Sequence, residues 1–482
     1  MNRRMIINAV GLVLRVEAVL LLLPAIVGVI YGERQTWLAF LISAAISLVL
    51  GLLPKYFLKP RTHVIYAKEG FIIVAFTWIM LSLVGAVPLV LAGAVTSYAD
   101  AFFEIVSGFT TTGSSVIPDV EVLSHGALFW RSFTHWVGGM GIIVFVMAIL
   151  PNVSERPIHI LRAEIPGPTV GKLVPRIKGT ALILYLIYIG MTVIETIMLL
   201  SGGMSFFESL LHAFGTAGTG GFGIKRDSIA GYSPYIQWVI TAFMILFGIN
   251  FNLYYLMLLK KFKAVVTSTE LWAYLGIIAS SIAVISWNIR HLFVGAEETV
   301  RAAAFQVSSI ISTTGYATTD FNLWPNLSKN ILLILMFIGG CAGSTAGGIK
   351  VSRIVLLFKL ISNEVKRMLH PRSVSSLRFE GKTVDGHTRK GVSNYFLIYF
   401  VCLLAIFLAL SFEPFDFETN FTAAVTCFNN VGPGFGAVGP TGGFGDYSAF
   451  AKIVLSFAML LGRLEIFPII IALAPVSWAR NR

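Results

Sequence analysis

The sequence predicts an all-α polytopic membrane protein: four pseudo-repeats of helix, re-entrant pore loop and helix around one pore, plus an N-terminal two-helix hairpin. Composition is the first reason, because 56% of the 482 residues are hydrophobic and only 12% are charged, with a mean hydropathy of +0.81. The second reason is a short motif that occurs four times at long, regular intervals, in which an apolar half-helix runs into a glycine corner. Repeats at a long period govern the whole fold.

The N-terminal segment is predicted to be a membrane hairpin, comprising residues 1–69 with a basic link at its end. Residues 6–30 are apolar and follow the basic start MNRR, but no small-residue cleavage site follows them, so they indicate a membrane helix and not a signal peptide. Arg15 and Glu17 within this helix are expected to pack against a neighbouring helix. A second helix is predicted at about 37–53.

The four pseudo-repeats are predicted to follow in order. Repeat one covers 70–178 and includes a cytosolic loop, and repeat two covers 179–269. Repeat three covers 270–390, with an intramembrane gating loop and a cytosolic link, and repeat four covers 391–482. The motif GGMG at 138–141 places small residues in a helix, where they allow close approach of a neighbour.

The clearest corner lies at 305–320, FQVSSIISTTGYATTD. Non-helical backbone at membrane depth is tolerated where it is buried in protein or lines a water-filled path. Glycine permits the φ angles that aim carbonyls at one axis, where they can replace the water around a cation. The alternative is that these glycines only make turns between helices. The predicted filter residues are Thr111, Thr112, Gly113, Thr219, Gly220, Gly221, Thr314, Gly315, Asn430, Val431 and Gly432.

These corners resemble those of the Trk/Ktr potassium-uptake membrane subunits, and the additional N-terminal hairpin resembles the TrkH/TrkG branch. The resemblance covers essentially the whole chain. It implies a cation-conducting fold with one filter glycine from each repeat, at Gly113, Gly220, Gly315 and Gly432. The fourth corner departs from the threonine pattern, since it reads NNVGP at 429–433.

A second irregular stretch, GGCAGSTAGGIK at 339–350, falls inside the expected exit helix of repeat three. Its density of glycine disfavours a regular helix, so we expect a loop that lines the pore or is buried in protein. The alternative is a glycine-rich packing face. The resemblance implies an intramembrane gating loop here, with gate residues Gly343, Ser344, Thr345, Ala346, Gly347, Gly348 and Lys350.

Arg463 lies in the final helix, in MLLGRLEIFP. A charge near the centre of a bilayer is costly and usually faces a cavity or a partner. The resemblance implies that this arginine belongs to the gate and projects into the pore beneath the filter, where it would repel a cation. The alternative is a packing role, as an ion pair with Glu465 or another salt bridge between packed helices.

The formal net charge of +12 indicates a membrane topology and no nucleic-acid partner. Most of the 36 Lys and Arg fall in alternate connecting segments, which predicts ten spans, cytosolic termini and corners approached from outside. Acidic residues near the outer ends are expected to enrich cations at the mouth, although they are equally consistent with ordinary loop charges. They are Asp119, Glu121, Asp227, Asp320, Asp416 and Asp446.

Other motifs do not support catalysis. The match to GxGxxG at 218–223 follows an apolar half-helix instead of a strand, and Gly381-Lys382-Thr383 lacks the first glycine of a P-loop. The three cysteines form no CxxC pair, and the eight histidines have no metal-ligand spacing. We therefore predict no enzyme, no cofactor in this chain, and K⁺ as a transported ion held at the filter residues only.

Together these features predict potassium uptake across a bacterial cytoplasmic (inner) membrane by a channel-like, multi-pass subunit within the lipid bilayer. Because the chain has no nucleotide site, the resemblance implies a cytosolic NAD/ATP-binding regulatory subunit of the TrkA type, and a homodimer. The alternative is a secondary symporter that couples K⁺ to H⁺ or Na⁺. That mechanism would require carboxylates along the path, and the sequence offers Glu17, Glu195 and Glu465 within its helices.

Overall fold

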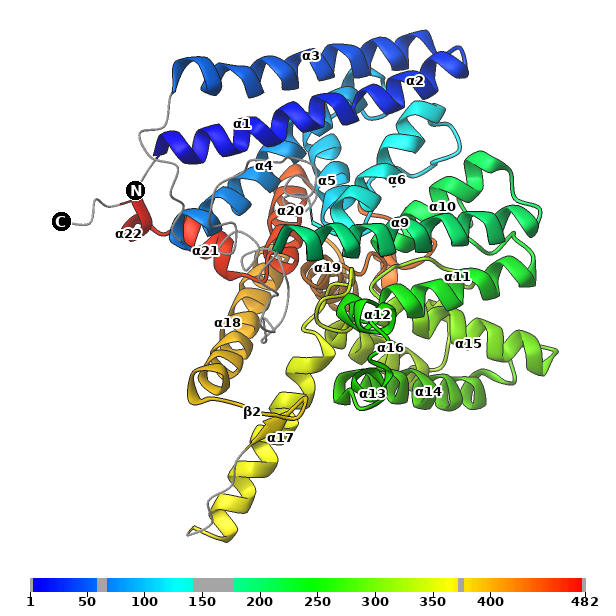
Figure 1. Ribbon diagram of the computed structural model, residues 1–482. Helices are drawn as coiled ribbons and strands as arrows, with labels where there is room; N and C mark the ends of the chain where they lie inside the picture. The colour runs from blue at the N-terminus through cyan, green and yellow to red at the C-terminus, as the bar shows by residue number, and fades with distance from the viewer. Residues whose placement is uncertain (1–2, 59–66, 142–176, 372–376, 479–482) are drawn as a thin grey trace.

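The computed structural model describes residues 3–58, 67–141, 177–371 and 377–478 (Figure 1). Within these ranges helices are the main secondary structure, and the one sheet is a hairpin of β1 (Arg378–Phe379) and β2 (Lys382–Thr383). The all-α prediction is therefore confirmed. Most of the cytosolic loop expected at 151–178 lies outside the described residues.

The N-terminal hairpin consists of α1 (Arg3–Leu20), α2 (Leu22–Ile30) and α3 (Arg34–Phe57). Helices α1 and α3 pack side by side at the top of Figure 1. The buried carboxylate of Glu17 accepts a hydrogen bond of 3.1 Å from Ser47 Oγ on α3. The backbone at Gly51 lies close against Arg15, since a Cβ there would be 2.8 Å from Arg15 Cγ. Both charged residues thus pack against the neighbouring helix, as the sequence predicts.

Four units with the same order follow, each made of an entry helix, a short inward helix and a return helix. The entry helices are α4 (Ala67–Leu91), α9 (Ile177–Ser201), α14 (Thr269–Ile289) and α18 (Gly386–Leu410). The inward helices are α5 (Tyr98–Phe109), α10 (Phe206–Gly218), α15 (Ala296–Ile311) and α19 (Phe417–Asn429). The return helices are α6 (His125–Gly139), α11 (Pro234–Phe247), α16 (Asn326–Ile338) and α20 (Ala449–Arg463).

Shorter elements connect or continue these helices. They are α12 (Phe251–Leu258), α13 (Phe262–Val266), η1 (Phe321–Leu323), η2 (Gly436–Val438), α21 (Phe467–Leu473) and α22 (Pro475–Trp478). One longer helix, α17 (Val351–Leu369), follows α16 after the 339–350 stretch and extends away from the other helices at the bottom of Figure 1.

Side-chain caps fix where three of the four inward helices begin. Ser97 and Asp416 accept hydrogen bonds from the backbone amides of Ala99 and Thr419, at the starts of α5 and α19. Ser205 forms a full capping box with Glu208 at the start of α10. Because such caps satisfy amides that a helix end leaves without partners, they set where α5, α10 and α19 begin, whereas Gly295 before α15 makes no side-chain cap.

The return helices are interrupted. Among the described residues, six helices are long and apolar enough to cross a membrane, or seven if α11 and α12, bent by 87°, are counted as one span. The ten predicted spans are therefore not ten continuous helices. Glycines at the breaks allow close approach: a Cβ on Gly138 or Gly462 would lie 1.9 Å from the carbonyl oxygen of Phe109 or Phe428, at the end of an inward helix. The close approach predicted for GGMG is confirmed.

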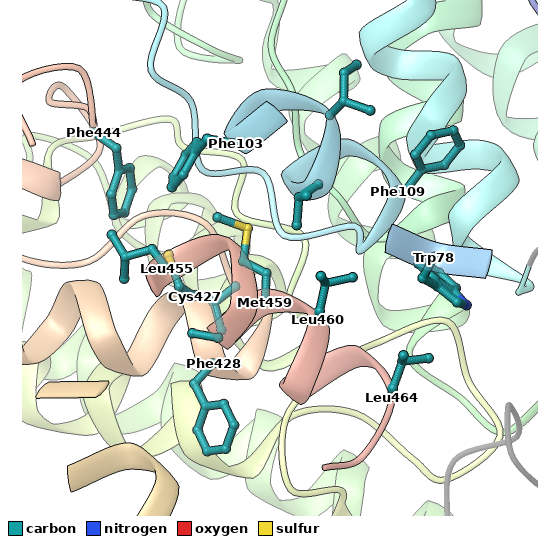
Figure 2. Close-up of a cluster of buried hydrophobic side chains, with 14 of the residues drawn as sticks. Trp78, Phe103, Phe109, Cys427, Phe428, Phe444, Leu455, Met459, Leu460 and Leu464 are labelled. Atoms are coloured by element: carbon teal, nitrogen blue, oxygen red, sulfur yellow. The ribbon is translucent and has the colours of Figure 1, made fainter. Parts of the chain in front are cut away.

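A buried apolar cluster joins the last unit to the first (Figure 2). Leu455 and Met459 of α20 are fully buried, and α20 packs against both α5 and α19. Phe103 of α5 and Phe428 of α19 belong to the same cluster. Between helices in a membrane such contacts act through close van der Waals packing, and here they hold α20 of the last unit against α5 of the first.

The hairpin of β1 and β2 lies between α17 and α18. Arg378 pairs with Thr383, and Gly381 forms the turn with φ +70°. Phe379 is buried with Leu356 of α17 and Val392 of α18. Gly381-Lys382-Thr383 is thus the last turn residue and the second strand of a β-hairpin, and not a phosphate-binding loop before a helix.

Candidate ion pathway

The four inward helices end in one repeated backbone conformation. Each ends at a residue in the left-handed region, followed by a middle residue and then a glycine with positive φ. The left-handed residues are Thr111 (φ 55°), Thr219 (55°), Thr313 (58°) and Asn430 (56°), and the glycines are Gly113 (83°), Gly221 (73°), Gly315 (84°) and Gly432 (104°). Left-handed backbone is uncommon outside glycine, so its occurrence at four equivalent places indicates one shared structure.

The same hydrogen bond holds each corner. The amide of the middle residue donates to a carbonyl in the last turn of the inward helix, which is the Schellman pattern of helix termination. The four bonds are Thr112 N to Ser107 O (2.9 Å), Gly220 N to Gly215 O (2.8 Å), Thr314 N to Ser309 O (2.8 Å) and Val431 N to Thr426 O (2.9 Å).

This pattern corrects the predicted register at the second corner. Gly221 is the structural match of Gly113, Gly315 and Gly432, whereas Gly220 takes the place of Thr112 and has no positive φ. Two adjacent glycines fit the sequence motif equally well, so the pattern alone could not choose between them. Thr313, which the sequence analysis did not select, takes the left-handed position of the third corner.

The corners touch one another in a closed ring. A Cβ added to each corner glycine would collide with the middle-residue carbonyl of the next corner. It would lie 2.0 Å from Gly220 O at Gly113, 1.8 Å from Thr314 O at Gly221, 2.3 Å from Val431 O at Gly315 and 2.8 Å from Thr112 O at Gly432. Only glycine allows this approach, so backbone carbonyls from all four units are brought together.

The electrostatics of the ring suit a cation. The C-terminal ends of α5, α10, α15 and α19 all meet there, and each helix end carries roughly half a negative charge from its aligned peptide dipoles. Within the described residues, no group of three or more His, Cys, Asp or Glu side chains could hold a metal ion. The polar atoms that pack around the corner glycines of the ring are main-chain carbonyl oxygens.

A cavity of about 510 Å³ adjoins the ring and reaches the glycines of all four corners. Of the six acidic residues predicted to enrich cations at the mouth, only Asp446 lines this cavity. Asp416 and Asp320 instead cap α19 and η1. Arg131, Lys225 and Arg226 also line the cavity. Both signs of charge therefore line this cavity, and the enrichment of cations by the acidic residues stays a prediction, as does the alternative of ordinary loop charges.

One of these basic groups is partly neutralised by an acidic neighbour. Lys225 Nζ lies 3.6 Å from a carboxylate oxygen of Glu208 and 4.2 Å from the ring centre of Tyr232. Burial raises the pKa of Glu208, but hydrogen bonds from Ser205 and the charge of Lys225 outweigh burial and lower the pKa overall. Glu208 therefore stays ionised beside Lys225 at neutral pH.

The irregular stretch at 339–350 lies directly against the ring. The amide of Gly347 donates to Thr313 Oγ1 at 2.7 Å, and the amide of Gly348 donates to the carbonyl of Asn429 at 3.0 Å. Thr345 Oγ1 donates to Phe247 O at 3.2 Å. The stretch is a non-helical loop buried in protein, as predicted, and it contacts two of the four corners.

The two ends of this loop are held by one carboxylate. Glu270 Oε1, in the first turn of α14, accepts hydrogen bonds from the amides of Ala342 (2.7 Å) and Ser352 (3.1 Å). Glu380, in the β-hairpin turn, accepts from the amide of Glu270 at 3.0 Å and so adjoins the same contact. Glu270 could not be predicted from the sequence, because only the tertiary fold brings α14 to the loop.

The other predicted gate residues complete the loop. Ser344 Oγ donates to Cys341 O at 2.6 Å, and Gly343 and Gly348 have positive φ. Lys350 is buried, has φ +82° and donates through Nζ to the carbonyl of Ala346. These contacts fold the loop tightly on itself and against its neighbours.

Arg463, the last residue of α20, joins this loop to the first unit. Its guanidinium donates to Thr345 O at 2.7 Å and to the carbonyls of Gly138 and Gly139 at 2.6 and 2.7 Å. Glu465 instead forms an ion pair with Arg353 of α17. The packing alternative for Arg463 thus finds its support in the bonds to Gly138 and Gly139, and both the gate role and the packing role stay predictions.

The comparisons with known proteins agree with this architecture. A family model described as "TrkH: Cation transport protein" matches residues 38–479. The chain is 34% identical to the Trk system potassium uptake protein TrkH of Escherichia coli K12 over 99% of this chain and 100% of that protein. It is 32% identical to the protein TrkG of the same organism over 98% of both chains.

A solved structure gives the same result. The crystal structure of the potassium transporter TrkH from Vibrio parahaemolyticus aligns with a TM-score of 0.90 and 33% sequence identity, over 99% of this chain and 100% of that one. Full-length similarity at this identity, together with the apolar helices, shows a multi-pass membrane protein. The chain belongs to the TrkH family of cation transport proteins.

Proposed function

We propose that this chain is a channel-like translocation subunit that takes up potassium across a bacterial cytoplasmic membrane. The closed ring of four corners carries the proposal, because it gathers main-chain carbonyls from four helix ends around one point. Support also comes from the full-length relatives, which are named Trk system potassium uptake proteins. Rings of carbonyls that replace the hydration shell are the basis of potassium filters.

The filter in this proposal consists of the four corners. The carbonyls of Thr112, Gly220, Thr314 and Val431, each packed against the glycine of the preceding corner, replace water around a dehydrated K⁺. The left-handed residues Thr111, Thr219, Thr313 and Asn430 turn the backbone so that the corners face one axis. The helix dipoles offset part of the cost of dehydration.

The gate in this proposal is the loop at 339–350 together with Arg463. The loop blocks the path beneath the ring sterically, and Arg463 both fastens the loop and adds a positive charge that opposes a cation. Opening then requires the loop to break its hydrogen bonds with Thr313, Asn429 and Arg463. Such a step separates gating from ion selection.

The wider setting belongs to the same proposal. Both termini lie in the cytosol of a bacterial cell, the subunit acts as a homodimer, and a cytosolic NAD/ATP-binding subunit of the TrkA type controls the gate. The regulatory subunit is included because a gate requires control, and the sequence of this chain contains no nucleotide-binding motif.

Coupled symport with H⁺ or Na⁺ finds less support than a channel-like mechanism. Glu17 accepts from Ser47 in the N-terminal hairpin, and Glu465 pairs with Arg353. Glu195 is buried in α9. None of the three lines the cavity above the ring, whereas a coupling carboxylate is expected beside the substrate path.

Ion flux through the purified full-length protein in liposomes tests the proposal. We expect K⁺ to move down its own gradient with equal pH and equal Na⁺ on both sides, and to move faster than Na⁺. Protein-free liposomes and the Gly276→Ala protein, changed at a helical glycine with open space around it, provide the controls. K⁺ movement that occurs only when an H⁺ or Na⁺ gradient is imposed would establish symport instead.

A further inference from the structure

A buried ion pair lies directly behind the ring at the first two corners. Glu104 of α5 and Arg131 of α6 have side-chain exposures of 0% and 2%, with Nη2 of Arg131 2.8 Å from Glu104 Oε1. The Nε of Arg131 donates to the same oxygen at 2.8 Å. Burying two charges is costly unless geometry and hydrogen bonding are good, so the remaining partners of the pair are informative.

On one side the ion pair contacts the extended segment that follows the first corner. Glu104 accepts from Ser115 Oγ at 2.9 and 3.1 Å and from the amide of Val116 at 2.9 Å. Arg131 Nη2 also donates to Ser115 Oγ at 3.3 Å. Both charges therefore converge on Ser115, close in sequence to the corner glycine Gly113.

On the other side Arg131 contacts the segment that follows the second corner. Its guanidinium lies 4.2 Å from the ring centre of Phe222, and Nη1 lies 3.5 Å from the carbonyl oxygen of Gly223. Phe222 and Gly223 directly follow the corner glycine Gly221. One ion pair thus contacts the backbone that follows two adjacent corners, and this backbone lines the cavity beside the ring.

The other two corners use neutral groups. Ser309 Oγ donates to Tyr316 O at 2.6 Å in the third unit, and Thr422 Oγ1 accepts from the amide of Phe435 at 2.9 Å in the fourth. Counted from the corner glycine, the matches of Glu104 are His212, Gln306 and Ala423. Counted from the residue before each return helix, the matches of Arg131 are Ile240, Leu332 and Leu455.

The geometry points to Glu104 and Arg131 as positioning residues that set the spacing between the first and second corners, and through it the ion preference of the ring. This inference rests on the proposed function, since it assigns a role within the filter. The reason is geometric. The middle carbonyl of the second corner, Gly220 O, packs against Gly113, and the segments that follow both corners contact the same ion pair. An ion pair that only stabilised the fold would not need to contact both of these segments.

The decisive double variant removes both charges and introduces the residue types that the fourth unit has at the matching positions. Glu104→Ala with Arg131→Leu reproduces the match of Ala423 and Leu455, so no charge is left buried without its partner. We expect this double variant to conduct, and its preference for K⁺ over Na⁺ in liposomes to fall about tenfold, a change of ~1.4 kcal/mol. Arg131→Lys, which keeps the charge but cannot span Glu104, Ser115 and Gly223 together, should fall by less.

A smaller variant keeps the inference testable if the double variant does not fold. Ser115→Ala leaves both charges paired and removes only the hydroxyl that they share, and it too should weaken ion preference. Removal of an ion pair at the outer end of α15 by Glu297→Gln with Arg301→Gln is the matched control, expected to leave preference unchanged.

The outcomes are distinct. Folded Glu104→Ala/Arg131→Leu or Ser115→Ala protein that keeps the original K⁺/Na⁺ preference overturns the positioning role, even if its thermal stability is lower. If substitutions at the corner glycines change preference while these do not, the filter stands and this inference fails. If neither set changes preference, the proposed filter itself fails.

Discussion

The guanidinium of Arg463 donates a hydrogen bond of 2.7 Å to the main-chain oxygen of Thr345, and so connects the end of α20 to the middle of the loop beneath the ring. A hydrogen bond to a charged group contributes about 1.5–3 kcal/mol. We therefore expect Arg463→Ala to raise basal K⁺ flux by about ten- to a hundredfold, since each ~1.4 kcal/mol changes a population tenfold. Tracer uptake into liposomes without any partner protein measures this.

The K⁺/Na⁺ preference of Arg463→Ala should stay unchanged, because the ring is not altered. Arg463→Lys is the matched control: it keeps the positive charge but cannot reach Thr345, Gly138 and Gly139 together, so its flux should be intermediate. If Arg463→Ala protein is made at normal levels and its flux is unchanged or lower, Arg463 is a packing residue and not part of the gate.

The corner glycines give a second prediction. A side chain on Gly221 would require φ +73° and would place Cβ 1.8 Å from Thr314 O. The backbone strain alone costs ~1–2 kcal/mol, and the collision must displace the neighbouring carbonyl. Gly221→Ala should therefore reduce K⁺/Na⁺ preference, as should Gly315→Ala, when the two ions compete in a flux assay.

Gly276 and Gly190 serve as controls, because they lie in helices with nothing within 4 Å of an added Cβ. Alanine there should leave flux unchanged and stabilise the protein by roughly 0.5–1 kcal/mol. Normal selectivity for both Gly221→Ala and Gly315→Ala would argue against the ring as the filter.

Some of the site could be predicted from local sequence because it depends on local chemistry. The corners at Gly113, Gly315 and Gly432 follow from an apolar half-helix that meets a glycine, and the loop at 339–350 follows from glycine density. The register at Gly220 and Gly221 could not be predicted, because two consecutive glycines satisfy the same pattern and only the contact with Thr314 distinguishes them.

The remaining features depend on long-range contacts. The break after Arg463 places Glu465 and Ile466 at positive φ, although neither residue favours it, and only the packing of the whole unit requires this. Glu104 and Arg131 are separated in sequence and read individually as an ordinary acid and an ordinary base. Their role is visible only where α5 and α6 meet.

Topology gives a third prediction. Single cysteines replacing Lys382, in the exposed hairpin, should react with a membrane-impermeant reagent only from the cytosolic side, and cysteines replacing Asp227 only from outside. The background is low because Cys341 and Cys427 are buried, and Cys402 can be changed to serine. Reaction of the Lys382→Cys protein from outside would reverse the proposed orientation.

The last prediction concerns Glu270, whose single oxygen Oε1 accepts from the amides of both Ala342 and Ser352 at the two ends of the loop. Glu270→Ala removes both bonds at once, so the loop should leave the ring more readily and basal K⁺ flux should rise. Each bond to a charged acceptor contributes about 1.5–3 kcal/mol, but Arg463 still holds Thr345, so the rise should be smaller than for deletion of residues 342–347. Glu270→Gln keeps an acceptor oxygen in place and should conduct nearly as the original protein does. Flux, K⁺/Na⁺ preference and thermal stability are measured for each variant. A loss of stability in Glu270→Ala without any increase in flux would show that the carboxylate supports the fold and does not restrain the loop.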